Sequence, residues 1–437
     1  MWTYYPDLLE TPVPRYTSFP TAAEFGPGVS AADYAAALEA ARGEVSLYLH
    51  VPFCEQICWY CGCNTGKANK AQRLASYLDA LHREIAITGV RLDRDVRVRR
   101  VAFGGGSPNA ISPTDFVRLI DALTLHMPLD RPVWSIELDP RTLSREWGQV
   151  MAVVGVSHAS LGVQTFDPGM QAAIGRVQPD AEIARAVDLL RGSGVSSLNF
   201  DLMYGLPGQT LEILEATLRR SVELGADRIA LFGYAHVPHL LPRQRRIDAS
   251  ALPGQAERFA MAEFGHGLLT AAGYVPIGFD HFARPEDPMA RALRAGTLRR
   301  NFQGFTDDPA RSLIGMGASA IGCFEDLLVQ NEKNAGRYRM LLSQDVLPAA
   351  HGIRRSTDDQ RRGAVIEALL CFGTARLDPD LAAEAAARIA PFARLGLARQ
   401  EGNTLTIAPA GLPYARTIAA LFDPYRQDSL RRFSSAV

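Results

Sequence analysis

The chain has 437 residues, of which 47% are hydrophobic and 21% are charged, and its formal net charge is −1. This composition is ordinary for a globular protein, and the length indicates two domains or one large α/β barrel with additions. The near-zero net charge gives no support for a nucleic-acid or membrane-surface partner. No stretch approaches the ~18 apolar residues of a membrane helix, and the N-terminus lacks a secretory signal, so we expect a cytoplasmic protein without membrane insertion.

The first 30 residues contain prolines at positions 6, 12, 14, 20 and 27. Proline fixes φ and removes a backbone donor, so this segment is predicted to be an extended arm and not a helix. Residues 14–21 combine aromatic side chains, hydroxyl groups and one arginine. Two interpretations stay open: the arm packs over the surface, or it covers an active site.

The middle of the chain alternates predicted strands and helices, beginning with a short Ala-rich helix at 31–42. Six such units predict right-handed βαβ connections and a parallel sheet, and six units instead of eight indicate an incomplete, laterally open barrel. Each strand ends in polar or glycine residues, at the edge where α/β barrels collect ligands and catalytic groups. The predicted strands are 45–51, 98–103, 133–138, 159–163, one beginning at 197, and 228–232; the intervening helices are 70–89, 113–126, 143–153, 179–192 and 210–224.

The last third of the chain is less regular. We predict a helix at 254–271, an edge strand within 274–282, and a glycine-rich segment at 315–321. Residues 397–399 and 404–407 flank Glu401-Gly402-Asn403, which predicts a β hairpin in an otherwise helical region. The predicted domains are an arm at 1–30, a partial barrel with an extension at 31–350, and a small helical domain with a hairpin at 351–437.

Four of the six cysteines lie within residues 54–63, in the spacing C-x3-C-x2-C-x-C. Clustered thiols in a chain without an export signal favour a metal site over disulfides. Three thiolates can hold a [4Fe–4S] cluster and leave one iron open to another ligand. A structural zinc site is the alternative, although zinc usually takes two C-x2-C pairs separated by a longer spacer. The four residues are Cys54, Cys58, Cys61 and Cys63.

The cysteine spacing directly after the first strand, together with a glycine run at 104–106 after the second, resembles the radical S-adenosylmethionine (radical SAM) superfamily. In that superfamily three cysteines hold a [4Fe–4S] cluster, and S-adenosylmethionine chelates the fourth iron. An electron from the cluster cleaves the cofactor, and the resulting 5′-deoxyadenosyl radical abstracts a hydrogen atom. The resemblance implies that Cys54, Cys58 and Cys61 ligate the cluster.

Further segments along the whole chain resemble the oxygen-independent coproporphyrinogen III oxidase family. The resemblance implies oxidative decarboxylation of two propionate side chains of coproporphyrinogen III to vinyl groups, which gives protoporphyrinogen IX. It also implies two S-adenosylmethionine molecules, an electron donor such as flavodoxin or ferredoxin, and a monomer. The segments are 14–21, 48–54, 61–64, 137–140, 162–164, 199–207, 234–236, 280–285, 301–304 and 431–434.

The resemblance also implies roles for individual residues. Tyr48, Cys63, Phe302 and Gln303 are the implied catalytic positions. We expect Arg176 to pair with the methionyl carboxylate, Glu137 to accept from an ammonium group and Asp201 to accept from ribose hydroxyls. The implied S-adenosylmethionine positions are Tyr48, Tyr60, Gly105, Gly106, Ser107, Glu137, Gln164, Arg176, Asp201, Ala235 and Ile321.

A tetra-anionic substrate needs cations, and five arginines lie in segments expected near the open barrel. Each of them has a simple alternative as a solvated surface residue. The five are Arg15, Arg243, Arg284, Arg299 and Arg300.

Two other functions stay open from the sequence. The first is a related haem chaperone or another porphyrin-modifying radical SAM enzyme; the chaperone branch lacks the arm and has phenylalanine at the position of Cys63. The second is a non-catalytic, zinc-stabilised protein. The mass of the porphyrin product distinguishes the first alternative from the oxidase, and the metal content distinguishes the second alternative from an iron–sulfur enzyme.

Overall fold

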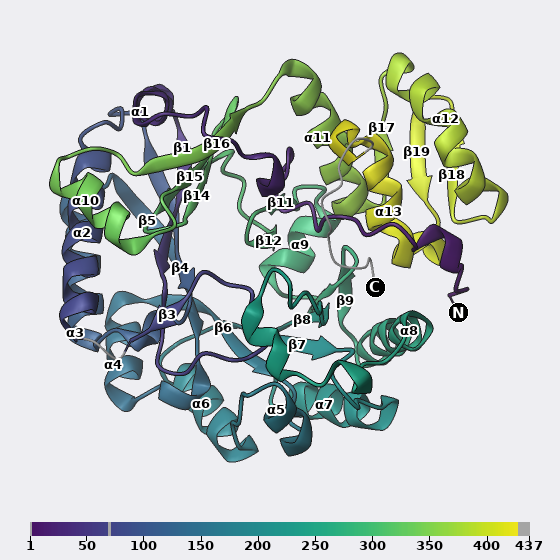
Figure 1. Ribbon diagram of the computed structural model, residues 1–437, viewed down its shortest axis with the longest axis horizontal. Coiled ribbons are helices and arrows are strands. Elements are labelled where there is room, and N and C mark those ends of the chain that lie inside the picture. Colours follow the sequence, from purple (N-terminus) through teal and green to yellow (C-terminus); the bar gives the residue numbers. More distant parts are fainter. Residues whose placement is uncertain (1, 69–70, 427–437) are drawn as a thin grey trace.

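A curved sheet of 12 strands organises the part of the chain that the computed structural model describes, residues 2–68 and 71–426 (Figure 1). Seven neighbouring strands of this sheet run parallel. In spatial order they are β13 (Ser312–Met316), β1 (Glu44–Val51), β4 (Arg97–Gly105), β5 (Leu129–Leu138), β6 (Val156–Gln164), β7 (Ser197–Tyr204) and β8 (Arg228–Gly233).

Antiparallel strands extend the sheet at both ends. Within the described ranges the two outermost strands, β16 and β9, do not pair with each other, so the barrel is open, as predicted. Three strands continue from β13, namely β14 (Ile321–Cys323), β15 (Leu327–Asn331) and β16 (Ala349–Arg354), and two continue from β8, namely β10 (His281–Ala283) and β9 (Val275–Ile277).

The six predicted strands are all present, but the sequence showed β13 only as a glycine-rich segment. At Gly315 a Cβ atom would lie 2.4 Å from the Ile321 carbonyl oxygen, so the close approach of β13 and β14 requires glycine. The glycines that signal a loop in the sequence are therefore part of a seventh parallel strand. The predicted edge strand at 274–282 is also two short strands, β9 and β10, instead of one.

Helices cover the outer face of the sheet (Figure 1). In α2 the buried residues Tyr77, Leu81 and Ile85 recur every four positions, with buried Leu78 beside them, which turns one stripe of the helix toward the strands. Except for α5, which the sequence analysis did not predict, the helices between parallel strands match the predicted ones. They are α2 (Ala71–Gly89), α3 (Pro113–His126), α4 (Arg145–Val154), α5 (Pro168–Ala173), α6 (Asp180–Gly192) and α7 (Leu211–Glu223).

Other helices lie before and after this region. The first residue of the helix predicted at 70–89 is outside the described ranges, as is the segment 431–434. In those ranges, no helix combines the length and apolar character that a membrane crossing needs. The remaining helices of the sheet region are α1 (Ala31–Ala40), α8 (Gln255–Ala271), α9 (Pro288–Arg294) and α10 (Ala335–Ser343).

A second hydrophobic core joins the N-terminal arm to the C-terminal helices. Arm residues Leu9, Val13 and Phe19 belong to this core, and the Tyr5 N–H donates to the Tyr414 hydroxyl at 2.8 Å. In Figure 1 the purple arm accordingly runs beside the yellow C-terminal elements. These elements are α11 (Thr357–Phe372), α12 (Pro379–Arg394), α13 (Ala415–Ala419) and a sheet in which β17 (Thr374–Arg376) joins the predicted hairpin, β18 (Ala398–Glu401) and β19 (Thr404–Ile407).

Short elements complete the description. The arm contains two 3-10 turns and is otherwise irregular, close to the extended arm that its prolines predict. The 3-10 helices are η1 (Pro6–Leu8), η2 (Ala22–Glu24), η3 (Pro108–Ala110), η4 (Pro140–Thr142), η5 (Pro242–Arg246), η6 (Ala249–Ala251), η7 (Pro409–Tyr414), η8 (Ala420–Phe422) and η9 (Pro424–Arg426); the short strands are β2 (Phe53–Cys54), β3 (Gly66–Lys67), β11 (Arg299–Asn301) and β12 (Gly304–Thr306).

Candidate functional site

The cysteine loop, residues 52–68, leaves the carboxyl end of β1 and is closed by the parallel pair of β2 and β3. The Gly66 N–H donates to the Pro52 carbonyl at 2.9 Å, and the Ala68 N–H donates to the Cys54 carbonyl at 3.0 Å. All six cysteines of the chain are free thiols. The loop therefore presents its thiols at the edge of the sheet that the sequence predicts for ligands.

Glycines let the cysteine loop lie directly on the turn after β4 and the turn after α5. A Cβ atom at Gly106 would lie 2.5 Å from the Phe53 carbonyl oxygen, and one at Gly175 would lie 2.6 Å from the Trp59 ring. The Trp59 N–H also donates to the Ile174 carbonyl at 3.1 Å. Since any larger residue would push the loop away, these positions explain why glycine occupies them.

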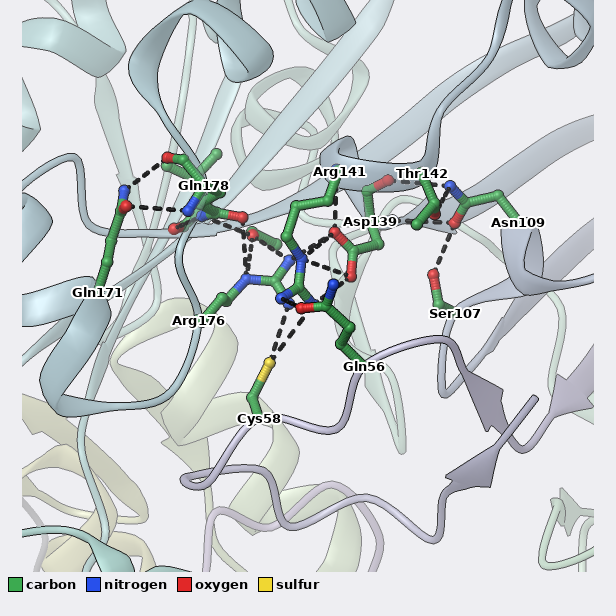
Figure 2. Close-up of polar contacts among 12 residues, drawn as sticks. Gln56, Cys58, Ser107, Asn109, Asp139, Arg141, Thr142, Gln171, Arg176 and Gln178 are labelled. Carbon is green, nitrogen blue, oxygen red and sulfur yellow. Dashed lines mark hydrogen bonds and ion pairs between the residues drawn. The ribbon is translucent and has the colours of Figure 1, made fainter. Parts of the chain in front are cut away.

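Two arginines converge on Cys58 around a shared aspartate (Figure 2). Arg176 Nη1 lies 3.3 Å and Arg141 Nη2 lies 3.7 Å from the Cys58 sulfur. Asp139 pairs with Arg141 at 2.6 Å and with Arg176 at 3.4 Å. Burial on its own would raise the pKa of Asp139, but the two guanidinium groups outweigh it, and the pKa lies below its usual value. The pair of cations therefore keeps the aspartate charged beside the thiol.

Asn109 connects this charged group to the glycine run. Its side-chain nitrogen donates to the Asp139 carbonyl and to the Thr142 hydroxyl, both at 2.9 Å, and its side-chain oxygen accepts from the Asp139 N–H at 3.0 Å. The Ser107 hydroxyl donates to the same oxygen at 2.6 Å (Figure 2). These hydrogen bonds therefore link the turns after β4 and β5, and Ser107 is part of that link.

Glu137 and Asp201 line a cavity of about 350 Å³ between the strands. The Gly105 N–H donates to Glu137 Oε2 at 3.1 Å, and a Cβ at Gly104 would lie 2.7 Å from the Glu137 carboxyl carbon. Burial, followed by repulsion from Asp201, raises the pKa of Glu137 to about 7. Asp201 accepts from Ser160 at 3.0 Å, so the glycine run holds Glu137 and β6 holds Asp201 at the cavity wall.

Comparisons with known proteins agree with this geometry. The Radical SAM superfamily model matches residues 48–220, which include the cysteine loop, the glycine run and Arg176. The oxygen-independent coproporphyrinogen III oxidase of Bradyrhizobium diazoefficiens is 41% identical over 98% of this chain and 98% of that protein. The chain belongs to the oxygen-independent coproporphyrinogen III oxidase family.

Other members of this family are similar over nearly the same length. The Pseudomonas aeruginosa protein of the same name is 38% identical over 97% of this chain and 96% of its own. The solved structure of the Escherichia coli coproporphyrinogen III oxidase, described as a radical SAM enzyme, superposes with a TM-score of 0.90 at 33% identity, covering 97% of this chain and 99% of that one. The α/β fold with an open parallel barrel, predicted from the sequence, is therefore confirmed.

Members of the radical SAM superfamily use a [4Fe–4S] cluster and S-adenosylmethionine. Among the described residues, no three His, Cys, Asp or Glu side chains converge on the position of a single ion. A cluster does not need such convergence because each thiolate binds a different iron of the cube. Three free thiols on one loop, with guanidinium groups directed at one of them, fit this cofactor.

Two of the predicted catalytic residues, Tyr48 and Phe302, are in contact, and a third, Gln303, follows Phe302 in the chain. The Tyr48 ring contacts the Phe302 ring edge-on with 4.7 Å between centroids, and its hydroxyl lies 3.1 Å from His50 Nδ1. Phe302 and Gln303 form the turn between β11 and β12. Phe302 lines a larger cavity of about 860 Å³, as does Ile321, whereas Gln303 lines the cavity of Glu137. The turn therefore lies between the two cavities.

Four other predicted site residues lie in the cysteine loop or in segments near it. They are Tyr60, Cys63, Gln164 and Ala235. The exposed Cys63 donates its N–H to the Cys61 sulfur at 3.4 Å, and a hydrogen bond with Cys63 lowers the pKa of Cys61 to about 6. Buried Gln164 has φ of 67°, a strained conformation for a residue other than glycine. The carbonyl groups of Tyr60 and Ala235 both accept from the side-chain nitrogen of Gln244, at 3.0 Å each.

Arg176 does not have the free guanidinium fork that we expected for a ligand carboxylate. Its Nε and Nη2 donate to the Gly162 carbonyl, and Nη2 also pairs with Asp139. These internal partners hold the side chain flat against the strand ends. A bidentate pair with a methionyl carboxylate would therefore require Arg176 to exchange partners.

The arginines expected near the substrate also have protein partners. Arg299 pairs with Glu367 at 2.7 Å, and Arg284 packs over the Tyr274 ring at 4.3 Å. Arg300 donates to two carbonyl groups of the N-terminal arm. Arg15 lies 4.6 Å over the Phe232 ring, and Arg243 donates to Thr65 at 3.3 Å. Substrate binding by these five residues stays a prediction.

Asp139, Arg141 and His50 have no role predicted from the sequence. Asp139 stands two positions after Glu137, and this alternate spacing at the end of a strand is a signal that could have shown it. Arg141 gave no such signal, because it reaches Cys58 only through the 3-10 turn η4.

Proposed function

We propose that this protein catalyses the oxygen-independent oxidative decarboxylation of two propionate side chains of coproporphyrinogen III, which yields protoporphyrinogen IX. The observation that carries the proposal is the full-length similarity to oxidases of that name, with the three thiols, the glycine run and Glu137 at one sheet edge. The protein is accordingly an oxidoreductase. When bound, the cluster and S-adenosylmethionine supply a carbon radical that removes hydrogen from the propionate carbon next to the ring.

The residues of the chain divide the remaining work. Cys54, Cys58 and Cys61 hold the cluster, with Arg141 and Arg176 as donors to the Cys58 sulfur. Guanidinium donors stabilise charge on a thiolate and so favour the reduced state of a bound cluster.

The two cavity carboxylates bind the cofactor. Glu137 accepts from the ammonium group of S-adenosylmethionine, because among the described residues only Gly105 supplies a hydrogen bond to its carboxylate. Asp201 is oriented by Ser160 and Asn199 toward the same cavity, where it accepts from ribose hydroxyls. We include a second S-adenosylmethionine in the proposal, near the turn at Phe302 that separates the two cavities.

The larger cavity is the proposed seat of the porphyrinogen. Its volume of about 860 Å³ lies in the range of ligand pockets, and Tyr16, Phe302 and Ile321 give it apolar walls. Loss of carbon dioxide from the substrate radical forms the vinyl group and releases one electron to an acceptor. We further propose that the protein works as a monomer with flavodoxin or ferredoxin as the electron donor.

Anaerobic turnover tests this function. The protein is reconstituted with iron and sulfide, then incubated with dithionite, S-adenosylmethionine and coproporphyrinogen III, and the products are identified by mass. We expect 5′-deoxyadenosine and a tetrapyrrole with two carboxyl groups fewer; Cys58→Ala abolishes both, whereas Cys371→Ala, outside the cysteine loop, retains both. Deoxyadenosine without decarboxylation would overturn the substrate and favour the chaperone or another porphyrin-modifying activity.

A further inference from the structure

Positive charge is concentrated beside the cysteine loop. Helix η5 contains three arginines in five residues, Arg243, Arg245 and Arg246, of which the last two are exposed. Lys67, one of only three lysines in the chain, is exposed within the loop itself. We call these four residues the basic rim. Since the whole chain has a formal net charge of −1, the basic rim is a local feature and not a reflection of the average composition.

The basic rim is fixed to the loop and does not merely lie near it. The buried Gln244, in the middle of η5, donates to the loop backbone. Arg243 and Arg246 each contact a side chain of the loop. Three separate contacts therefore hold η5 in one register against the loop. They are Gln244 Nε2 to the Tyr60 carbonyl at 3.0 Å, Arg243 Nη1 to the Thr65 hydroxyl at 3.3 Å, and the Arg246 guanidinium 5.7 Å from the Trp59 ring centroid.

The charge of the basic rim is available to a partner. In the ranges that the structure describes, none of its four cations forms an ion pair. The exposed Glu55 lies in the cysteine loop, and the exposed Asp248 follows η5. Four cations and two carboxylates leave a net charge of +2. Two exposed apolar side chains, Leu240 and Val177, each 62% exposed, adjoin η5 and Arg176. Arginine with a small apolar centre is typical of protein interfaces.

We propose that the basic rim is the docking surface for an acidic protein that carries one electron to the cluster. This inference rests on the proposed function, since only a cluster that must be reduced requires such a donor at this loop. Docking here places the donor against Trp59 and the loop that contains Cys58, while both cavities stay free for cofactor and substrate. Weak redox complexes are small and depend on opposite charge for fast association.

A nucleic acid or an anionic membrane fits this surface less well. Nucleic-acid binding typically neutralises about 6–10 phosphates, more than four cations interrupted by two carboxylates can provide. A folded acidic protein needs only a small patch of opposite charge. The size of the basic rim therefore favours the protein donor.

The test compares two ways of reducing the same cluster. In the variant Arg245→Glu/Arg246→Glu, stopped-flow absorbance follows reduction of the reconstituted cluster by reduced flavodoxin, which is acidic, and by dithionite. We expect the second-order rate with flavodoxin to fall about tenfold or more at low salt and the difference to vanish at high salt, because the steering charge is lost or screened. The rate with dithionite stays within twofold of the unmodified protein, and binding of oxidised flavodoxin weakens in parallel.

Arg94→Glu/Arg97→Glu is the matched control, because it changes the charge equally at the opposite, amino end of β4. Equal flavodoxin rates in the rim variant and the unmodified protein would overturn the proposal, and so would an equal loss in the control. A rim variant that retains its flavodoxin rate but no longer binds RNA or anionic vesicles would also overturn it. Decarboxylation driven by dithionite tests the proposed function separately, since it does not need the protein donor.

Discussion

Glu84 on α2 is fully buried and Glu137 on β5 is half-buried, and loss of hydration raises the pKa of each to about 7. Their hydrogen bonds differ. Glu84 accepts from the Gly317 N–H and the Asn331 side chain, both at 2.7 Å, and from the Tyr338 hydroxyl. It therefore ties α2 to the turn after β13 and to α10, outside the sheet.

Glu137 has fewer hydrogen-bond donors among the described residues, although loss of hydration raises its pKa in a similar way. The Gly105 N–H donates to one oxygen at 3.1 Å, and the like charge of Asp201 raises the pKa further. A buried carboxylate is stable only when it is paired or hydrogen-bonded. The hydrogen-bond acceptors of Glu84 are therefore satisfied within the protein, whereas Glu137 faces a cavity with room for a cationic ligand.

The largest expected effect separates the two residues by stability. Glu84→Ala removes the acceptor of the Gly317 N–H and the Tyr338 hydroxyl and one of the acceptors of Asn331, so we expect the free energy of unfolding to fall by about 3–5 kcal/mol in urea titrations. Glu137→Ala, the matched variant, removes a carboxylate that the protein does not saturate and is expected to cost less than about 1 kcal/mol. Equal losses in the two variants would break the comparison.

Cofactor binding is expected to show the opposite order. Glu137→Gln retains an acceptor for Gly105 but loses the charge that attracts an ammonium group, worth about 1.5–3 kcal/mol. The dissociation constant of S-adenosylmethionine in anaerobic equilibrium dialysis should rise about 10- to 100-fold. Glu84→Gln, tested while folded, should change it less than about twofold. A similar rise in both variants would contradict the assignment of Glu137.

The pH dependence of binding sharpens this test. A carboxyl group with a pKa near 7 is charged above that pH and neutral below it, so the affinity for a cationic ligand falls as the pH falls through 7. Between pH 7.5 and pH 6 we expect S-adenosylmethionine to bind about tenfold more weakly. The dependence should be absent in Glu137→Gln. A profile that is the same in both proteins would assign the titration to another group.

A smaller effect is expected at Arg141. Arg141→Gln removes a charged donor from the Cys58 sulfur, so the reduced cluster loses stabilisation and its midpoint potential becomes more negative. If the reduced cluster loses about 1.4 kcal/mol of stabilisation, the ratio of reduced to oxidised cluster changes tenfold, which is 59 mV for one electron. We expect the shift in midpoint potential, measured by anaerobic redox titration, to be no larger than about this value. Arg185→Gln is the control, because Arg185 donates to the Leu143 carbonyl next to η4 and does not touch the loop. An unchanged potential would remove Arg141 from this role.

Much of the fold was accessible from the sequence because its signals are local. The alternation of strands and amphipathic helices predicted the six units, and the cysteine spacing predicted the loop. The strand β13 was missed because its parallel partner β1 is distant in the chain and because Gly317, at its end, serves a close approach to His50 of β1, which local propensity cannot show. Gly315 instead serves a close approach to Ile321 of the adjacent strand β14.

The sequence was enough to predict which residues form the candidate site. It was not enough to predict which residues pair with them. Glu137, Asp201 and Gly105 come together as expected at the strand ends. The partners of Arg176 were not predictable, because Asp139 approaches it from another strand end after folding. The number of hydrogen bonds that a buried carboxylate accepts likewise depends on the folded structure. The sequence around Glu84 has no pattern that separates it from Glu137 in this respect.

The most direct measurement is the pKa of Glu137 itself, with and without S-adenosylmethionine. Isotope-edited infrared spectroscopy, referenced to the Glu137→Gln variant, resolves the protonated carboxyl band as the pH changes. We predict a pKa near 7 without the cofactor, a decrease of more than about one unit when it binds, and no change at Glu84. A pKa of Glu137 that stays near 7 in the complex would contradict the assignment of this carboxylate to the cofactor.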